Sequence, residues 1–358
     1  MKTNYYKPTL NRILPISIIS LSLFIALTTT VTNANTNLFT EESQKLHKLW
    51  ENGATKFTNH SKDQLLKMIN KFHPVSKNDQ AHLHFFSFLS SDNKKQSEGV
   101  LGLDLPLNFN WREARQGCMV PSLDQGECGS CYAYTTAAML AEKLCIQNNH
   151  TQAVPLSPAY IMSCDPYADG CNGGVVPQVI DYLLEEGIPS NECMNYYNSS
   201  FETCPNQCIK QQPSSVEQNQ FLQIQRDQFD YKVKCKVGSK RQLLSIDEMK
   251  QEIYQNGPVA SSMIIYDDLV AYRSGVYHYD GDSMIIGSHA ILIVGWGFDP
   301  QQNLQYWEVQ NSWGSDWGEH QGYFRIKMGE SEIASELFGG AHACDPEIQN
   351  NKITEVFQ

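Results

Sequence analysis

The sequence has too little positive charge for several classes of protein. Lysine and arginine number 27 against 39 aspartates and glutamates, which gives a formal net charge of −12 over 358 residues. This deficit argues against nucleic acid as a partner, because phosphate binding depends on a surplus of Lys and Arg. Glycine and proline, at 23 and 15, are not enriched, which excludes collagen-like and low-complexity chains. The sequence also contains no internal repeat.

Long apolar runs are scarce as well. The one clear run, residues 13–27, follows a positively charged start that contains Lys2, Lys7 and Arg12. At about 15 residues it is shorter than the ~20 that a membrane-spanning helix needs. This order, followed by small and polar residues, predicts a secretory signal peptide over residues 1–34. We therefore expect an exported protein of the lysosome, the phagosome or the extracellular space, with no membrane span after the signal is removed.

Cysteine is absent from residues 35–104, whereas all 11 cysteines lie between Cys118 and Cys344. An exported chain enters an oxidising compartment, where most cysteines are paired. Because the count is odd, one thiol stays free and requires a chemical explanation. The change in composition predicts a domain boundary near Leu105.

Residue spacing predicts helices early in the chain and strands in its last third. Apolar residues recur with helical period in the first part, and with a period of two later. This order predicts an α+β protein with two lobes. The expected helices cover 41–51, 131–145 and 175–186, and a further helical segment begins at the capping-box pair Ser61 and Gln64. The expected strands cover 291–294, 306–310 and 323–328.

Cys131 stands where a glycine-bearing loop, which starts at Asp124, enters a predicted helix. A thiol at a helix N-terminus faces the positive end of the helix dipole, which lowers its pKa and favours the attacking thiolate. Cys128 and Cys131 also form a C-x-x-C pair, which allows a redox pair or half of a zinc site. No thioredoxin-like βαβ pattern and no second C-x-x-C or His pair accompanies it. We therefore predict that Cys131 is a nucleophile, and we expect no metal and no cofactor.

A cysteine nucleophile needs a base, which can lie far away in the sequence. His289 begins one apolar strand pattern, and Asn311 follows the end of the next. An imidazole at a strand end can take the thiol proton, and a neighbouring amide can hold the ring in the useful tautomer. The sequence therefore predicts that Cys131, His289 and Asn311 form a catalytic group.

Together these segments resemble the papain family of cysteine proteases. The resemblance implies a papain-like two-lobed α+β fold, with the active site between a helical left lobe, roughly 118–220, and a β-barrel-like right lobe, roughly 221–358, of a peptidase domain at 105–358. The shared motifs are Gln-x-x-x-Gly-Ser-Cys-Tyr from Gln125 to Tyr132, Ser163-Cys164, Cys171-Asn-Gly-Gly174, the segment around His289, and Asn-Ser-Trp-Gly-x-x-Trp-Gly from Asn311 to Gly318.

The resemblance implies roles in peptide-bond hydrolysis through an acyl-enzyme. Cys131 attacks the scissile carbonyl, His289 protonates the leaving amine, and Asn311 orients His289. Gln125 donates to the oxyanion hole, beside the backbone N–H of Cys131.

Four further positions are implied to bind substrate. Gly173 and Gly174 pair with its backbone, and Trp313 shields the His–Asn hydrogen bond from water. Glu336 lies at the floor of the second specificity pocket and lets the enzyme accept arginine as well as apolar residues there.

Within the family the cathepsin B group is the most similar. Cathepsin B uses a paired His-His on an occluding loop to bind the substrate's C-terminal carboxylate. The matching stretch, 187–208, is short, and no histidine occurs between His150 and His278. We therefore predict chiefly an endopeptidase. The alternatives are a dipeptidyl carboxypeptidase like cathepsin B and a non-catalytic binding relative.

The resemblance also implies partners and disulfides. Residues 35–104 become an inhibitory propeptide that lies across the cleft, so the chain is a zymogen. The other partners are peptide and protein substrates and cystatin-type inhibitors. The implied disulfides are Cys118–Cys145, Cys128–Cys171, Cys164–Cys204 and Cys193–Cys208, and by elimination Cys235–Cys344.

Overall fold

The computed structural model describes residues 50–69, 104–194, 204–210, 225–227, 231–279 and 281–350. These residues belong to one unit, Leu49–Gln358. The predicted signal peptide and most of the predicted propeptide lie outside the described residues. We call residues 50–69 the N-terminal segment.

The helices of the first half centre on α5, Cys131–Gln147, which is buried along most of its length. The next long helix, α7 (Val176–Glu185), carries a proline in its first turn, where the missing N–H costs no hydrogen bond. Both helices lie where apolar spacing predicts them. The other α-helices are α2 (Lys62–Lys67), α4 (Trp111–Ala114), α6 (Pro158–Cys164) and α8 (Ile246–Asn256), and the 3-10 helices are η1 (Gln116–Cys118), η2 (Gly170–Asn172), η3 (Asp267–Ala271), η4 (Glu330–Glu332) and η5 (Glu336–Phe338).

The strands of the second half form one large sheet. Its order is β1-β8-β11-β10-β9-β7-β12-β6, and β2 pairs with β9. Strands β9 and β10 contain the segments predicted at 291–294 and 306–310, and β11 covers the segment predicted at 323–328 except for its last residue. The members of the sheet are β1 (Trp50–Asn52), β2 (Phe109–Asn110), β6 (Arg241–Leu243), β7 (Val259–Tyr266), β8 (Tyr272–Tyr277), β9 (Ile285–Asp299), β10 (Leu304–Gln310), β11 (Tyr323–Lys327) and β12 (Ala341–Ala343).

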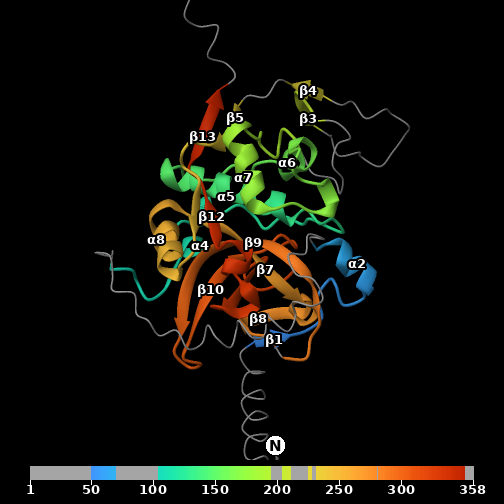
Figure 1. Cartoon of the computed structure of the whole chain (residues 1–358), viewed down its shortest axis with the longest axis vertical. Helices are drawn as coiled ribbons and strands as arrows, with labels where there is room; N and C mark the ends of the chain where they lie inside the picture. The colour runs from blue at the N-terminus through green and yellow to red at the C-terminus, as the bar shows by residue number, and fades with distance from the viewer. Residues whose placement is uncertain are drawn as a thin grey trace, which may run out of the picture. The chain divides into compact units, whose positions relative to one another are not determined.

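Helices and strands separate into two regions, as Figure 1 shows, with α5, α6 and α7 in one and β7 to β11 in the other. Helix α5 packs against β9 between them. The predicted α+β class is therefore confirmed. The two lobes do not separate at the single boundary predicted at 220/221. The strands β5 (Tyr231–Cys235) and β13 (Pro346–Asn350) come after this boundary, yet they pair with each other and pack on α7 and α5 of the helical region. A further small pair is β3 (Cys208–Lys210) with β4 (Gln225–Asp227).

The N-terminal segment differs from the sequence prediction at its start. A helix over 41–51 is wrong at its end, because Trp50 and Glu51 lie in β1 and pair antiparallel with β8; residues 41–49 lie outside the described residues. Trp50 stacks on Tyr272 at 6.1 Å between ring centroids and donates from Nε1 to the carbonyl of His278. Pairing with an exposed strand edge outweighs the local helical spacing.

The predicted capping box is confirmed at the start of α2. The hydroxyl of Ser61 accepts from the backbone N–H of Gln64, and Oε1 of Gln64 accepts from the N–H of Ser61 at 2.9 Å. Both bonds satisfy amides that would otherwise have no partner in the first turn.

All five disulfides form in the expected pairs. They join Cys118–Cys145, Cys128–Cys171, Cys164–Cys204, Cys193–Cys208 and Cys235–Cys344. The free cysteine is Cys131, which accounts for the odd count of 11.

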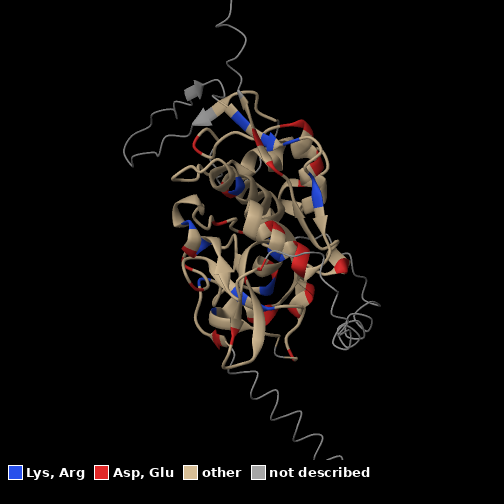
Figure 2. Ribbon diagram, turned by 90° about the vertical axis from the view of Figure 1, so that its left-hand side faces the viewer, with Lys and Arg blue, Asp and Glu red and all other residues tan. Residues whose placement is uncertain are grey.

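Charges of both signs are interspersed over the described ribbon (Figure 2). That picture shows no continuous basic track on the described residues, in keeping with the acidic composition. Among the same residues, no helix is both long enough and apolar enough to cross a bilayer.

Candidate active site

Cys131 is the first residue of α5 and is 0% exposed. The helix has no side-chain cap at Ser130, so its first amides are open to the sulfur. The backbone N–H of Ala290, in β9, donates to Sγ of Cys131 at 3.3 Å. One hydrogen bond thus joins the helix of one region to the central strand of the other, at the predicted nucleophile.

His289 precedes Ala290, so the same stretch of β9 carries the predicted base. Its Nε2 lies 2.7 Å from Oδ1 of Asn311, and that oxygen also accepts from the N–H of Ser312 at 2.8 Å. Because the atom accepts a backbone N–H, it is an oxygen, and Nε2 of His289 must donate to it. Asn311 therefore leaves Nδ1 free to exchange a proton, and the role of His289 as the base of Cys131 stays a prediction.

Gln125 is fully buried and is connected to the same loop. Its backbone N–H donates to the carbonyl of Ser312 at 2.9 Å, and its Oε1 accepts from the Ser312 hydroxyl at 2.6 Å. Its Nε2 donates to the carbonyls of Met68 and Cys128, each at 2.7 Å. Ser312 therefore holds the side chain of Gln125. Sequence reasoning missed this residue, although it stands between two predicted site residues in the Asn-Ser-Trp motif.

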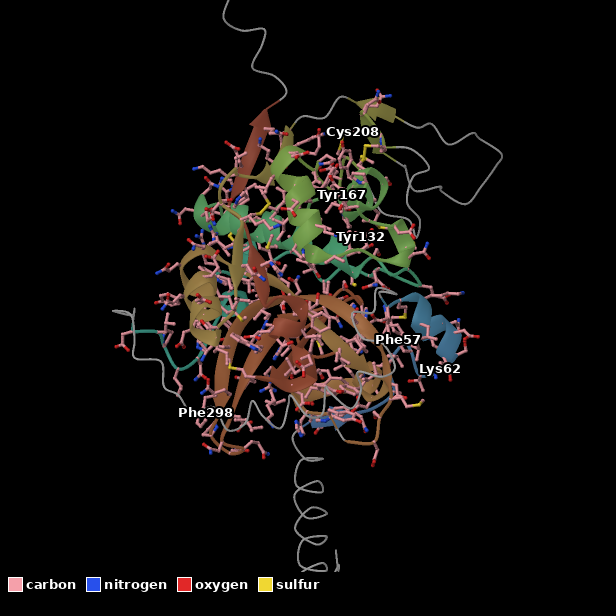
Figure 3. All side chains as sticks on the ribbon, viewed as in Figure 1. Phe57, Lys62, Tyr132, Tyr167, Cys208 and Phe298 are labelled. Atoms are coloured by element: carbon pink, nitrogen blue, oxygen red, sulfur yellow. A yellow bond between two sulfur atoms is a disulfide. The ribbon has the colours of Figure 1, made fainter. Side chains whose placement is uncertain are left out.

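The N-terminal segment covers these residues. Met68 and Ile69 are each 3% exposed, and the Met68 carbonyl lies on the amide of Gln125. Phe57, labelled in Figure 3, meets the ring of Trp313 edge-on at 5.5 Å between centroids. Trp313 in turn lies 4.9 Å from the imidazole of His289. The site is therefore covered in the described structure, and the backbone carbonyl of Met68 accepts a hydrogen bond from the side-chain amide of Gln125.

The expected low pKa of Cys131 is wrong for this covered state. Burial raises the pKa of the Cys131 thiol to about 11, although the N–H groups of Ala290, Tyr132 and Cys131 itself act to lower it. Burial also lowers the pKa of His289 to about 4, against the hydrogen bond with Asn311. Desolvation penalises the charged form of both groups. The amides at the start of α5 favour the thiolate, but the burial of the sulfur outweighs them.

Gly174 lies against the ring of Tyr132. A Cβ added at Gly174 would come within 2.7 Å of that ring, so a larger residue could not keep this backbone path. The hydroxyl of Tyr132 donates to the carbonyl of Gly170 at 3.0 Å. Tyr132, buried in α5, thereby fixes the stretch from Gly170 through Gly173 to Gly174.

Glu336 is the first residue of η5, and it is exposed. Glu336 takes no part in the hydrogen bonds that join Gln125 to Ser312 and Asn311 to His289. Within the described residues, no group of three His, Cys, Asp or Glu side chains is arranged to hold a metal ion.

A free thiol at a helix start, a histidine oriented by an amide, and a second amide aimed at a carbonyl define a thiol hydrolase site. Comparison with known proteins agrees with this class. A sequence model of the papain family of cysteine proteases matches residues 105–341, and the chain belongs to that family.

Two relatives from Giardia intestinalis are cathepsin B-like. The chain is 33% identical to cathepsin B-like CP2 over 236 residues, which cover 65% of this chain and 72% of that protein. It is 32% identical to cathepsin B-like CP3 over 260 residues, which cover 71% and 81%. Among solved structures, procathepsin B S9 from Trypanosoma congolense shares the fold, with a TM-score of 0.61, 24% identity, and coverage of 87% of this chain and 98% of that one.

Proposed function

We propose that the chain is the zymogen of a cysteine endopeptidase in which Cys131 is the nucleophile and His289 is the acid and base. The observation that carries this proposal is the position of the one free thiol. It lies at the start of α5, on the amide of Ala290, beside a histidine whose Nε2 is held by Asn311. Export to the lysosome, the phagosome or the extracellular space is supported by the predicted signal peptide and the five disulfides.

The reaction follows from this arrangement. The Cys131 thiolate adds to the scissile carbonyl, and the developing oxyanion accepts from Nε2 of Gln125 and from the backbone N–H of Cys131. His289 gives its proton to the leaving amine as the C–N bond breaks, which leaves a thioester on Cys131. His289 then removes a proton from water, which attacks the thioester and releases the acid. Asn311 keeps the ring in position throughout.

The covering segment supports synthesis as an inactive precursor. Met68 and Ile69 are buried at the site, and Phe57 covers Trp313, so a substrate cannot reach Cys131 while residues 50–69 remain. We infer that activity requires their removal with the rest of the propeptide, 35–104. The same cleft would then accept peptide and protein substrates or cystatin-type inhibitors.

Endopeptidase action is supported by the absence of histidine from His150 to His278, which removes the imidazole pair that would bind a terminal carboxylate. Part of the matching stretch, 195–203, lies outside the described residues. The test uses one quenched peptide with a free or an amidated C-terminus. We expect similar cleavage of both by the processed enzyme at internal bonds. If amidation abolishes cleavage, or if C-terminal dipeptides leave first, the enzyme is a dipeptidyl carboxypeptidase.

We also propose that Glu336 selects the second residue before the scissile bond. Its support is its exposed position at the start of η5, next to η4, which packs on β7. Glu336→Gln should lower the ratio of kcat/KM for Arg-Arg over Phe-Arg dipeptide substrates, because it removes the charge and keeps the shape. Glu185→Gln, an exposed carboxylate on α7, is the matched control. An unchanged ratio in the Glu336 variant contradicts this role.

A further inference from the structure

A lysine of the N-terminal segment lies between two carboxylates of the peptidase domain. Nζ of Lys56 is 2.5 Å from Oδ2 of Asp124 and 3.7 Å from Oδ1 of Asp316. The lysine side chain is 20% exposed, whereas the two carboxylates are 51% and 65% exposed. The peptidase domain thus binds an ammonium group that belongs to a segment outside it.

The backbone around this ammonium forms a cradle. Oδ1 of Asp124 accepts from the N–H of Gly126 at 3.0 Å, which orients the carboxylate and leaves Oδ2 for the cation. Gly314 has a φ of +80°, and a Cβ added there would lie 3.0 Å from Oδ1 of Asp316 and 3.2 Å from Nζ of Lys56. A side chain at position 314 would therefore compete with the ammonium for the same space.

The cradle adjoins the side of the site on which His289 would protonate the leaving amine. Asp124 forms an isolated antiparallel bridge with Trp313, and Trp313 contacts His289 at 4.9 Å between centroids. His289 is the group that protonates the leaving amine, so residues beyond the scissile bond pass on its side. Asp124 also directly precedes Gln125, the donor to the oxyanion. A side chain in the cradle thus comes from a residue shortly after the cleaved bond.

We propose that, after the N-terminal segment is removed, Asp124 and Asp316 bind a lysine or arginine side chain of the substrate just after the scissile bond. This specificity rests on the proposed peptidase function. In the precursor, Lys56 supplies the same chemistry: a cation on a flexible apolar stem, held by two carboxylates that belong to separate loops. Once Lys56 has left, two negative charges remain close together with no cation between them, which disfavours an acidic residue and favours a basic one.

The experiment uses the processed enzyme and a set of internally quenched peptides that are identical before the scissile bond. Lys, Gln or Glu is placed in turn at each of the first three positions after that bond. At low ionic strength we expect kcat/KM to be about three- to tenfold higher for Lys than for Gln at one of these positions, and lower for Glu. The preference should decrease as salt is raised, because the carboxylates are exposed to solvent.

Variants of the two carboxylates test whether they cause the preference for Lys over Gln. Asp124→Asn keeps an acceptor for Gly126, and together with Asp316→Asn it should bring the Lys-to-Gln ratio close to one. Asp316→Lys should instead raise hydrolysis of the Glu peptide relative to the Gln peptide, a gain that misfolding cannot produce. Asp247→Asn, an exposed carboxylate in the first turn of α8, should keep the wild-type ratio.

The outcomes separate this inference from the function on which it rests. If none of the peptides is cleaved, the proposed peptidase function is wrong. If all are cleaved with equal preference for Lys, Gln and Glu, or if the double variant keeps the wild-type preference, the peptidase stands and the cation site is overturned.

Discussion

The carbonyl oxygen of Met68 accepts a hydrogen bond of 2.7 Å from Nε2 of Gln125. The N-terminal segment therefore does more than exclude substrate by its bulk. It places a peptide carbonyl on the same donor that the proposed mechanism uses for the scissile carbonyl. The same contact shows that a main-chain carbonyl can reach this amide next to Cys131.

Gln125→Ala removes that donor. We expect kcat/KM of the processed enzyme on a fluorogenic peptide to fall about 10²–10³-fold, the usual effect of losing one oxyanion donor. Gln147→Ala, an exposed amide at the end of α5, is the control and should stay near wild type. A loss below about threefold in the Gln125 variant, with the fold intact by circular dichroism, contradicts the assigned role.

Asn311→Asp places a negative charge on the Nε2 side of His289. A neighbouring anion favours the imidazolium form, so the pKa of His289 should rise. Since activity is lost when the imidazolium deprotonates, the alkaline limb of the kcat/KM profile should move to higher pH. Asn148→Asp, at the C-cap of α5, serves as the control. A profile that stays in place would show that Asn311 does not act through the imidazole.

The thiol should titrate differently before and after processing. In the covered state burial raises the pKa of Cys131 to about 11, so the thiol carries its proton at neutral pH. Once water reaches the site, the amides of Ala290 and Tyr132 and the helix dipole favour the thiolate, and the pKa should fall. Alkylation by iodoacetamide as a function of pH measures both midpoints. Steric cover changes only the rate, so equal midpoints in precursor and processed enzyme would contradict this account.

A buried ion network ties α5 to the second half of the chain. Nζ of Lys143, whose side chain is 0% exposed, donates to Glu252 at 2.6 Å, and Arg241 bridges Glu252 to Asp345 at 2.7 and 2.6 Å. Burial alone would raise the pKa of Glu252, but Lys143 and Arg241 outweigh it and hold this pKa below its ordinary value.

Glu252→Gln leaves the Lys143 charge buried without its partner, so the free energy of unfolding at neutral pH should fall by about 3–5 kcal/mol. A depressed folded-state pKa contributes stability above the unfolded-state pKa, and this stability is lost as the pH falls through the folded value. The difference between wild type and variant in urea unfolding should therefore shrink below about pH 4. Glu347→Gln, an exposed carboxylate paired with the half-buried Lys234, should change stability by less than about 1 kcal/mol. A pH-independent difference would contradict this assignment.

Much of the fold follows from spacing and local chemistry. The helix from Cys131 and the strands that carry His289 and lead to Asn311 lie where the sequence predicts them, because their apolar periods are long and regular. The capping box at Ser61 is likewise local. Trp50 lies in a strand because it pairs with the edge of β8, and the local sequence around Trp50 does not indicate a partner so far away in the chain.

The candidate site could be predicted in part. Motifs identify Cys131, His289 and Asn311, and the structure places Ala290 on the thiol and Asn311 on the imidazole. The raised thiol pKa could not be predicted, because it depends on how deeply parts of the chain that are far apart in the sequence bury the sulfur. The pairing of Lys56 with Asp124 and Asp316 is missed for the same reason.

Cys131 is the proposed catalytic nucleophile, and we propose that it is covered in the precursor. Labelling with an epoxysuccinyl inhibitor of cysteine proteases, followed by peptide mapping of the modified cysteine, tests both points. We expect one equivalent to attach to Cys131 in the processed enzyme, with loss of peptide hydrolysis in proportion, and we expect no labelling of the intact precursor. Labelling at another residue, a processed enzyme that stays unlabelled, or equal labelling of the precursor would contradict this proposal.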